Sequence, residues 1–121
     1  MDELEEAVGR EFAPLLGGPA AYVTSGAAAA LTPATALCVT GDTPGAIDQL
    51  PSISGSRRRV LTQRVDRDPC DHTVTSVGVK LTAISYPGST RPDELQRELD
   101  ETLAAVLWRP GRVGDLLSLC R

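Results

Sequence analysis

Three small residues, Ser25-Gly26-Ala27, follow a short apolar run and open a stretch that is almost pure alanine. Serine and threonine favour the start of a helix, so Thr24 or Ser25 is expected to cap one here. The first N–H groups of a helix lack intrahelical acceptors, and the helix dipole adds partial positive charge. Small side chains let an anion approach these groups. Thr24, Ser25, Gly26 and Ala27 are therefore candidate phosphate ligands, although a tightly packed alanine-rich core helix with a serine cap would have the same sequence.

The chain has few cysteine and histidine residues, the types that often act in catalysis or bind metals. The three cysteines, Cys38, Cys70 and Cys120, are widely spaced and form no CxxC pair. This pattern indicates reduced thiols in a cytoplasmic protein. The single histidine, His72, has no second histidine to join it, so no metal site is expected. The acidic residues of region 93–101 are interpreted as a solvated surface, and no catalytic residue is assigned.

Composition excludes several classes of function. The chain has 121 residues with 41% hydrophobic and 23% charged residues, which is typical of one globular domain. The net charge of -4 argues against general nucleic-acid binding, and the basic triplet Arg57-Arg58-Arg59 is interpreted as a solvated loop. The acidic, amphipathic residues 1–15 do not resemble a signal peptide. The weakly polar run 27–39 is shorter than the roughly 20 residues of a membrane span.

The first half of the chain predicts helices around one short strand. Residues 2–16 predict an N-terminal helix, with Leu4, Val8, Phe12 and Leu15 on one face. Residues 20–23 predict a strand, and a helix follows to about residue 39. Pro33 lies inside that helix, so a kink or an early end is expected there. A short helix over 43–50 has proline at its first helical position.

The second half alternates strands with helices. Strands are predicted at 60–63, 80–85 and 104–108, with helices over 68–78 and 90–100 between them. Such alternation favours parallel crossover connections. The sequence therefore predicts an α/β fold, a partial doubly wound and mostly parallel sheet with flanking helices. Residues 1–121 are taken as one domain that begins with the helix over 1–16.

Residues 22–50, with the sequence YVTSGAAAALTPATALCVTGDTPGAIDQL, resemble the phosphate loop of one family of pyridoxal-phosphate enzymes. This family includes bacterial selenocysteine synthase and D-glucosaminate-6-phosphate ammonia-lyase. A weaker likeness continues from Val60 to Trp108. The resemblance implies the large domain of the aspartate-aminotransferase type of fold, with Thr24 to Ala27 holding the phosphate of pyridoxal phosphate. It also implies a cytoplasmic lyase or transferase that forms a homo-oligomer.

The sequence departs from this family where the cofactor's chemistry would be done. The chemistry needs a lysine for the Schiff base and a carboxylate for the pyridine nitrogen. The only lysine is Lys80, which opens a predicted strand at the amino edge of the sheet. Asp66 stands where relatives tend to carry a residue that can stack on the ring. The family's own lysine and carboxylate would lie beyond the strand 104–108, so the chain is expected to be a truncated large domain.

Three functions are compatible with these observations. The chain could be a fragment or degenerate member of the pyridoxal-phosphate lyase and transferase family, inactive by itself. It could instead be a non-catalytic module that binds a phosphorylated small molecule or pairs with a related full-length subunit. A split enzyme, completed by a separate polypeptide, is the third. None of the three implies a membrane or a nucleic acid as partner.

Overall fold

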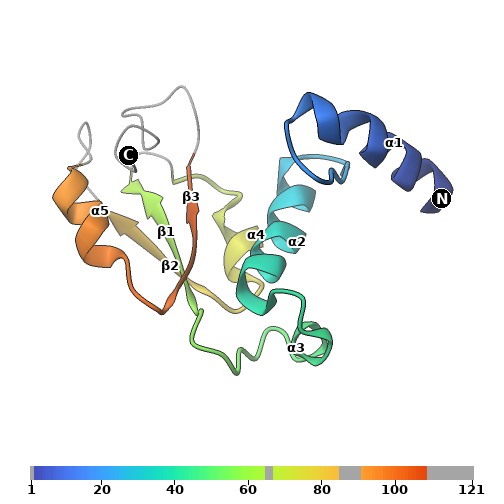
Figure 1. Ribbon diagram of the computed structural model, residues 1–121. Coiled ribbons are helices and arrows are strands. Elements are labelled where there is room, and N and C mark those ends of the chain that lie inside the picture. Colours follow the sequence, from blue (N-terminus) through green and yellow to red (C-terminus); the bar gives the residue numbers. More distant parts are fainter. Residues whose placement is uncertain (1, 65–66, 85–90, 109–121) are drawn as a thin grey trace. The chain divides into compact units, whose positions relative to one another are not determined.

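The computed structural model describes residues 2–64, 67–84 and 91–108, and the chain divides into two compact units (Figure 1). The first unit is Met1–Ala30 and the second is Leu31–Arg121. The boundary falls within one helix, α2. In the described ranges, no helix is long and apolar enough to cross a membrane.

The first unit contains the helix α1 (Asp2–Leu15) and the segment that leads into α2. Its first turn is acidic, which the helix dipole favours. Gly9 and Ala13 are its buried residues. A Cβ at Gly9 would lie only 2.5 Å from the carbonyl oxygen of Ala21, so the returning segment passes close to the α1 backbone because Gly9 has no side chain.

Most of the apolar face predicted on α1 stays exposed, with only Val8 half-buried, because the segment packs on the small residues instead. Leu4 is 65% exposed and Leu15 is 79% exposed. The predicted strand over residues 20–23 is wrong, since the structure assigns no strand to them. No backbone hydrogen bond to another described residue is recorded for them. A strand exists only where a second strand accepts its hydrogen bonds, and β-forming residue types cannot supply that partner.

The next two helices agree with the predicted positions. The helix α2 spans Ala27–Thr40, and the short helix α3 spans Pro44–Asp48, with Thr43 as its N-cap. The expected early end at Pro33 is wrong, because α2 continues past it to Thr40. On either side of the proline, Leu31 and Val39 pack against the core of the second unit, which offsets the hydrogen bond that proline removes.

The second unit is a small α/β fold with a three-stranded parallel sheet. Its strands are β1 (Arg59–Gln63), β2 (Lys80–Ile84) and β3 (Leu103–Leu107), and its connecting helices are α4 (Asp71–Thr75) and α5 (Pro92–Glu98). The strand order is β2-β1-β3, and both pairings are parallel. The chain therefore reverses its direction across the sheet after β2. The predicted alternation of strands and helices is confirmed.

Side chains on the opposite faces of β1 belong to two separate hydrophobic clusters. Val60 faces the cluster to which α2 and α4 contribute, with Leu31, Val39, Val74 and Val79. Leu61 is fully buried on the other face, in a cluster with Ile84 of β2, Leu95 of α5, Leu103 and Trp108. Helices therefore lie on both faces of the sheet, with α5 on the side opposite α4 and α2 (Figure 1). β1 is central in the sheet and is the most completely buried strand.

A polar network joins the amino end of β1 to the last residue of α5 and to the segment that follows α5. The Arg59 guanidinium donates to a Glu98 carboxylate oxygen at 2.6 Å and to the Glu98 carbonyl at 2.8 Å. It also lies 3.4 Å from the Asp100 carboxylate. These acceptors, Glu98 first, raise the pKa of Arg59. Hydrogen bonds from the Thr102 hydroxyl and N–H lower the pKa of Asp100, with a smaller contribution from Arg59.

The lowered pKa of Asp100 predicts an acid-dependent loss of stability. Folding favours the ionised carboxyl, so the stabilisation is fully present above its ordinary pKa of 3.8. It is lost as the pH falls through the lower folded-state value. We expect the unfolding midpoint in urea to drop more steeply below about pH 4 in the wild type than in Asp100→Asn. Parallel pH profiles of the two proteins would contradict this assignment.

Candidate functional site

The predicted phosphate ligands lie at the exposed start of α2. Thr24 is half-buried, and Ser25, Gly26 and Ala27 are exposed. The Gly26 carbonyl accepts the Ala30 N–H at 3.0 Å, which makes Gly26 the residue that precedes the helix. The Thr24 hydroxyl donates to the same carbonyl at 2.9 Å. The four predicted residues are consecutive in the sequence and lead directly into the first turn of α2.

The expected side-chain cap is wrong, and this leaves the helix start open. Among the described residues, neither Thr24 nor Ser25 accepts a hydrogen bond from an N–H of the first turn. The N–H groups of Ala27, Ala28 and Ala29 also lack any recorded backbone acceptor. The free amides therefore lie slightly later than the sequence predicts, in the first turn itself.

The space beside Gly26 is open. A Cβ at Gly26 would meet no heavy atom within 4 Å outside its chain neighbours. The donor set consists of the three N–H groups, and Ser25, which is exposed, precedes them in the sequence. An oxyanion accepts hydrogen bonds from all of them, and the dipole of a fourteen-residue helix adds favourable charge. These residues therefore fit the phosphate of a cofactor such as pyridoxal phosphate.

Lys80 lies where the sequence predicts it. It is the first residue of β2, it is exposed, and its register partner is Arg59, the first residue of β1. This position is the amino edge of the sheet. In parallel α/β sheets, ligands bind beyond the carboxyl ends of the strands, so Lys80 is on the wrong edge to hold a ligand's aldehyde.

Of His72 and Asp66, the two other residues considered in the sequence, the structure describes only His72. His72 is exposed on α4, and its Nδ1 donates a hydrogen bond to the Pro69 carbonyl. This contact is local and structural. Asp66, the residue expected at the ring-stacking position, lies outside the described residues.

The carboxyl end of β1 holds polar residues that sequence reasoning missed. Thr62 and Gln63 are each only 1% exposed. The Thr62 hydroxyl has no hydrogen-bond partner among the described residues. Because the chain changes direction across the sheet here, this end is the switch point at which open α/β sheets bind ligands. The sequence Val60-Leu61-Thr62-Gln63 is typical of a buried strand, so nothing in it marks Thr62 and Gln63 as candidate binding residues.

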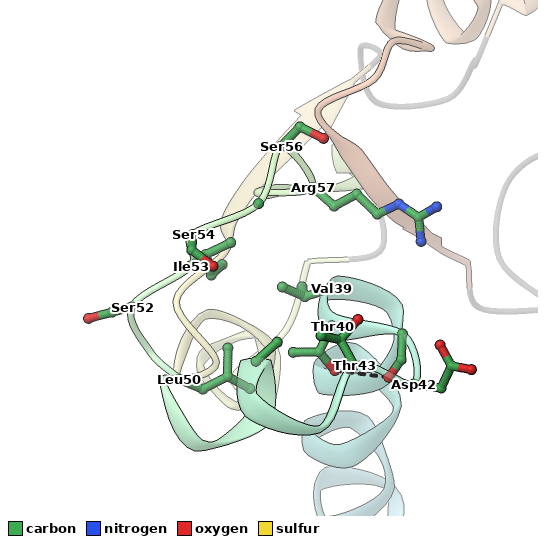
Figure 2. Close-up of a pocket in the computed structure, with 13 residues that line it drawn as sticks. Val39, Thr40, Asp42, Thr43, Leu50, Ser52, Ile53, Ser54, Ser56 and Arg57 are labelled. Atoms are coloured by element: carbon green, nitrogen blue, oxygen red, sulfur yellow. Dashed lines mark hydrogen bonds between the residues drawn. The ribbon is translucent and has the colours of Figure 1, made fainter.

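A pocket of about 470 Å³, also missed, lies at the opposite end of β1 (Figure 2). It is formed by the end of α2, by α3 and by the loop over residues 52–57. Val39, Leu50 and Ile53 supply apolar lining, and Arg57 supplies the only basic group. The Thr40 hydroxyl donates to the Ala36 carbonyl, so it could only accept a hydrogen bond from a ligand.

Comparisons with known proteins assign no family to this arrangement. No protein-family model and no curated protein matches the chain. The described residues also contain no group of three or more His, Cys, Asp or Glu side chains placed to hold a metal ion.

Proposed function

We propose that the chain is a degenerate member of the pyridoxal-phosphate lyase and transferase family that binds the cofactor phosphate at residues 24–27. One observation carries the proposal. Three adjacent N–H groups without backbone acceptors begin a fourteen-residue helix, after the exposed Ser25 and the open space at Gly26. These are the donors that a dianionic phosphate ester requires.

The architecture of the second unit is compatible with this proposal. A parallel sheet with helices on both faces and a switch point beside β1 is what a partial doubly wound domain of this family would contain. When bound, pyridoxal phosphate supplies an electron sink for carbanion chemistry. The proposed role of this chain is narrower, because its residues bind and orient the phosphate.

We also propose that no lysine of this chain forms a Schiff base with the cofactor's aldehyde. Its single lysine, Lys80, is exposed at the amino edge of the sheet. Condensation of an aldehyde with a lysine requires the amine beside the bound aldehyde. We therefore propose that Lys80 has no part in cofactor binding.

Calorimetric titration with three ligands tests the proposal. Pyridoxine 5′-phosphate has the ring and the phosphate without a reactive aldehyde, pyridoxine has only the ring, and glycerol phosphate has only the phosphate. Several charge-assisted hydrogen bonds, each contributing about 1.5–3 kcal/mol, predict that pyridoxine binds at least tenfold more weakly than its phosphate ester. Lys80→Arg is expected to leave all three affinities unchanged.

The same titrations separate the two leading functions. Equal affinities for pyridoxine 5′-phosphate and glycerol phosphate would favour the second candidate, a general module for phosphorylated small molecules. The position of Lys80 at the start of β2 is also compatible with that candidate, because a module that binds only a phosphate group needs no lysine to react with an aldehyde. Equal affinities for pyridoxine and its phosphate ester would contradict both functions.

A further inference from the structure

The pocket of about 470 Å³ at the amino end of β1 lies entirely within the second unit (Figure 2). Its volume is within the roughly 300–1,000 Å³ of pockets that bind small molecules. The loop that forms one wall is held by hydrogen bonds at both of its ends. The Ser52 N–H donates to the Gln49 carbonyl at 2.8 Å. The Arg58 guanidinium donates to the Gly55 carbonyl, also at 2.8 Å. Contacts within the chain therefore fix the walls of this pocket.

Two opposite charges line the pocket. Asp42 follows the end of α2, Arg57 precedes β1, and both side chains are exposed. They form no ion pair with each other or with another residue that the structure describes. In Figure 2 both extend to the same side of the view, Arg57 from the loop and Asp42 from the turn between α2 and α3. Both charges are therefore available to a ligand that carries a group of each sign.

The surroundings of Asp42 favour an ammonium group. The helix α2 ends at Thr40, and the carbonyl end of a helix carries partial negative charge. Thr40 is buried and lines the pocket, and its hydroxyl already donates to the Ala36 carbonyl, so towards a ligand it can only accept. An ammonium group has only donors. The acceptors at this side of the pocket therefore match it.

The rest of the lining favours a carboxylate and an apolar group. Arg57 is the only basic residue that lines the pocket, and a guanidinium can donate two parallel hydrogen bonds to a carboxylate. Val39, Leu50 and Ile53 supply apolar lining. In Figure 2, Leu50 and Ile53 lie on the side away from the two charges. Val39 and Ile53 also pack against the core of the second unit, which holds this apolar wall in place.

We propose that this pocket binds a small zwitterion with an apolar side chain, either a free amino acid or a dipeptide. The carboxylate of the ligand pairs with Arg57, its ammonium group pairs with Asp42, and its side chain lies against the apolar wall. A ligand with a single charge gains only one of these two attractions, so the pocket selects the zwitterion. The proposal is independent of phosphate binding, because residues 24–27 belong to the first unit.

Titrations of the full chain followed by ¹H–¹⁵N NMR test this site, because they detect weak binding and identify the amides that respond. Leucine and leucyl-leucine are the probes, and the tighter of the two distinguishes an amino acid from a dipeptide. We expect saturable shifts in region 39–57. The amide of the tighter probe lacks the carboxylate and its desamino analogue lacks the ammonium group, and each should bind about fivefold more weakly. No saturable shift with either probe, or equal affinity for the zwitterion and either analogue, would overturn the proposal.

Two single variants should have crossed effects on these ligands. Arg57→Gln should weaken binding of the zwitterion and the desamino analogue about fivefold and leave binding of the amide unchanged. Asp42→Asn should weaken binding of the zwitterion and the amide without weakening that of the desamino analogue. Arg97→Gln and Asp48→Asn are the matched controls, because both residues are exposed in the second unit and neither lines the pocket. Equal losses in a variant and its control, or one loss common to all three ligands, would contradict the assigned contacts.

Discussion

Ala27→Asp is expected to reduce the affinity for pyridoxine 5′-phosphate roughly a hundredfold while stabilising the protein slightly. The new carboxylate would stand at the first helical position of α2, among the unbonded N–H groups. Two like charges about 4 Å apart repel by about 1 kcal/mol in water and by about 4 kcal/mol near a protein surface. The same carboxylate interacts favourably with the helix dipole, by about 0.3–1 kcal/mol.

Ala34→Asp is the matched control for this substitution. It adds the same charge to an exposed alanine of the same helix, seven residues and roughly 10 Å farther along its axis. Screening at that distance should keep the affinity within about threefold of the wild type. Aspartate in a helix interior costs roughly 0.5 kcal/mol relative to alanine, so this variant should be less stable.

The two variants therefore change binding and stability in different combinations. Calorimetric titration measures the affinity, and urea unfolding followed by circular dichroism measures the stability. A loss of affinity that follows loss of stability would indicate damage to the fold. If Ala27→Asp binds the phosphate ester as tightly as Ala34→Asp does, the start of α2 is not the phosphate site.

Gly78→Ala is expected to destabilise the protein by about 3 kcal/mol. A Cβ at Gly78 would lie 2.1 Å from the carbonyl oxygen of Pro51, and φ at this glycine is +109°. The overlap is with backbone, so a side-chain rotation cannot relieve it. Forced overlap typically costs 1–3 kcal/mol, and a positive φ adds about 1–2 kcal/mol for a residue with a Cβ. Such a loss is large against the 5–15 kcal/mol total of ordinary domains.

Two other glycines separate the causes of this effect. Gly41 has φ of +59° with open space around its Cβ position, so Gly41→Ala should cost only the conformational part, about 1 kcal/mol. Gly45 lies inside α3 with open space and no positive φ, so Gly45→Ala should stabilise by about 0.5–1 kcal/mol. Urea unfolding of the three variants should follow this order. Equal stability of Gly78→Ala and Gly41→Ala would show that Pro51 does not restrict Gly78.

The local elements of this chain could be predicted because neighbouring residues determine them. The apolar period and the acidic first turn predict α1, whose observed bounds are Asp2–Leu15. Short β-branched runs between turn signals predict β1 and β2 within one residue at each described end. The alternation of these elements is enough to predict a parallel sheet, because parallel strands need a crossover connection.

The failures share one physical origin, which is contact between residues distant in sequence. Residues 20–23 have strand-forming side chains but no strand beside them. The early end expected at Pro33 does not occur, because α2 continues to Thr40 with Leu31 and Val39 packed against the core of the second unit. The face of α1 that becomes buried is set by Gly9 and its approach to Ala21, which hydrophobicity alone does not indicate.

The candidate site divides in the same way. The sequence by itself determined that small residues and hydroxyls stand at the start of a helix and that the only lysine opens a strand, because residue type and order specify both. The tertiary structure alone decided which amides stay unbonded, that Thr62 and Gln63 are buried at the switch point, and that Asp42 and Arg57 line one pocket. Those features depend on contacts between segments that are distant in the sequence, and these contacts cannot be predicted from the local sequence.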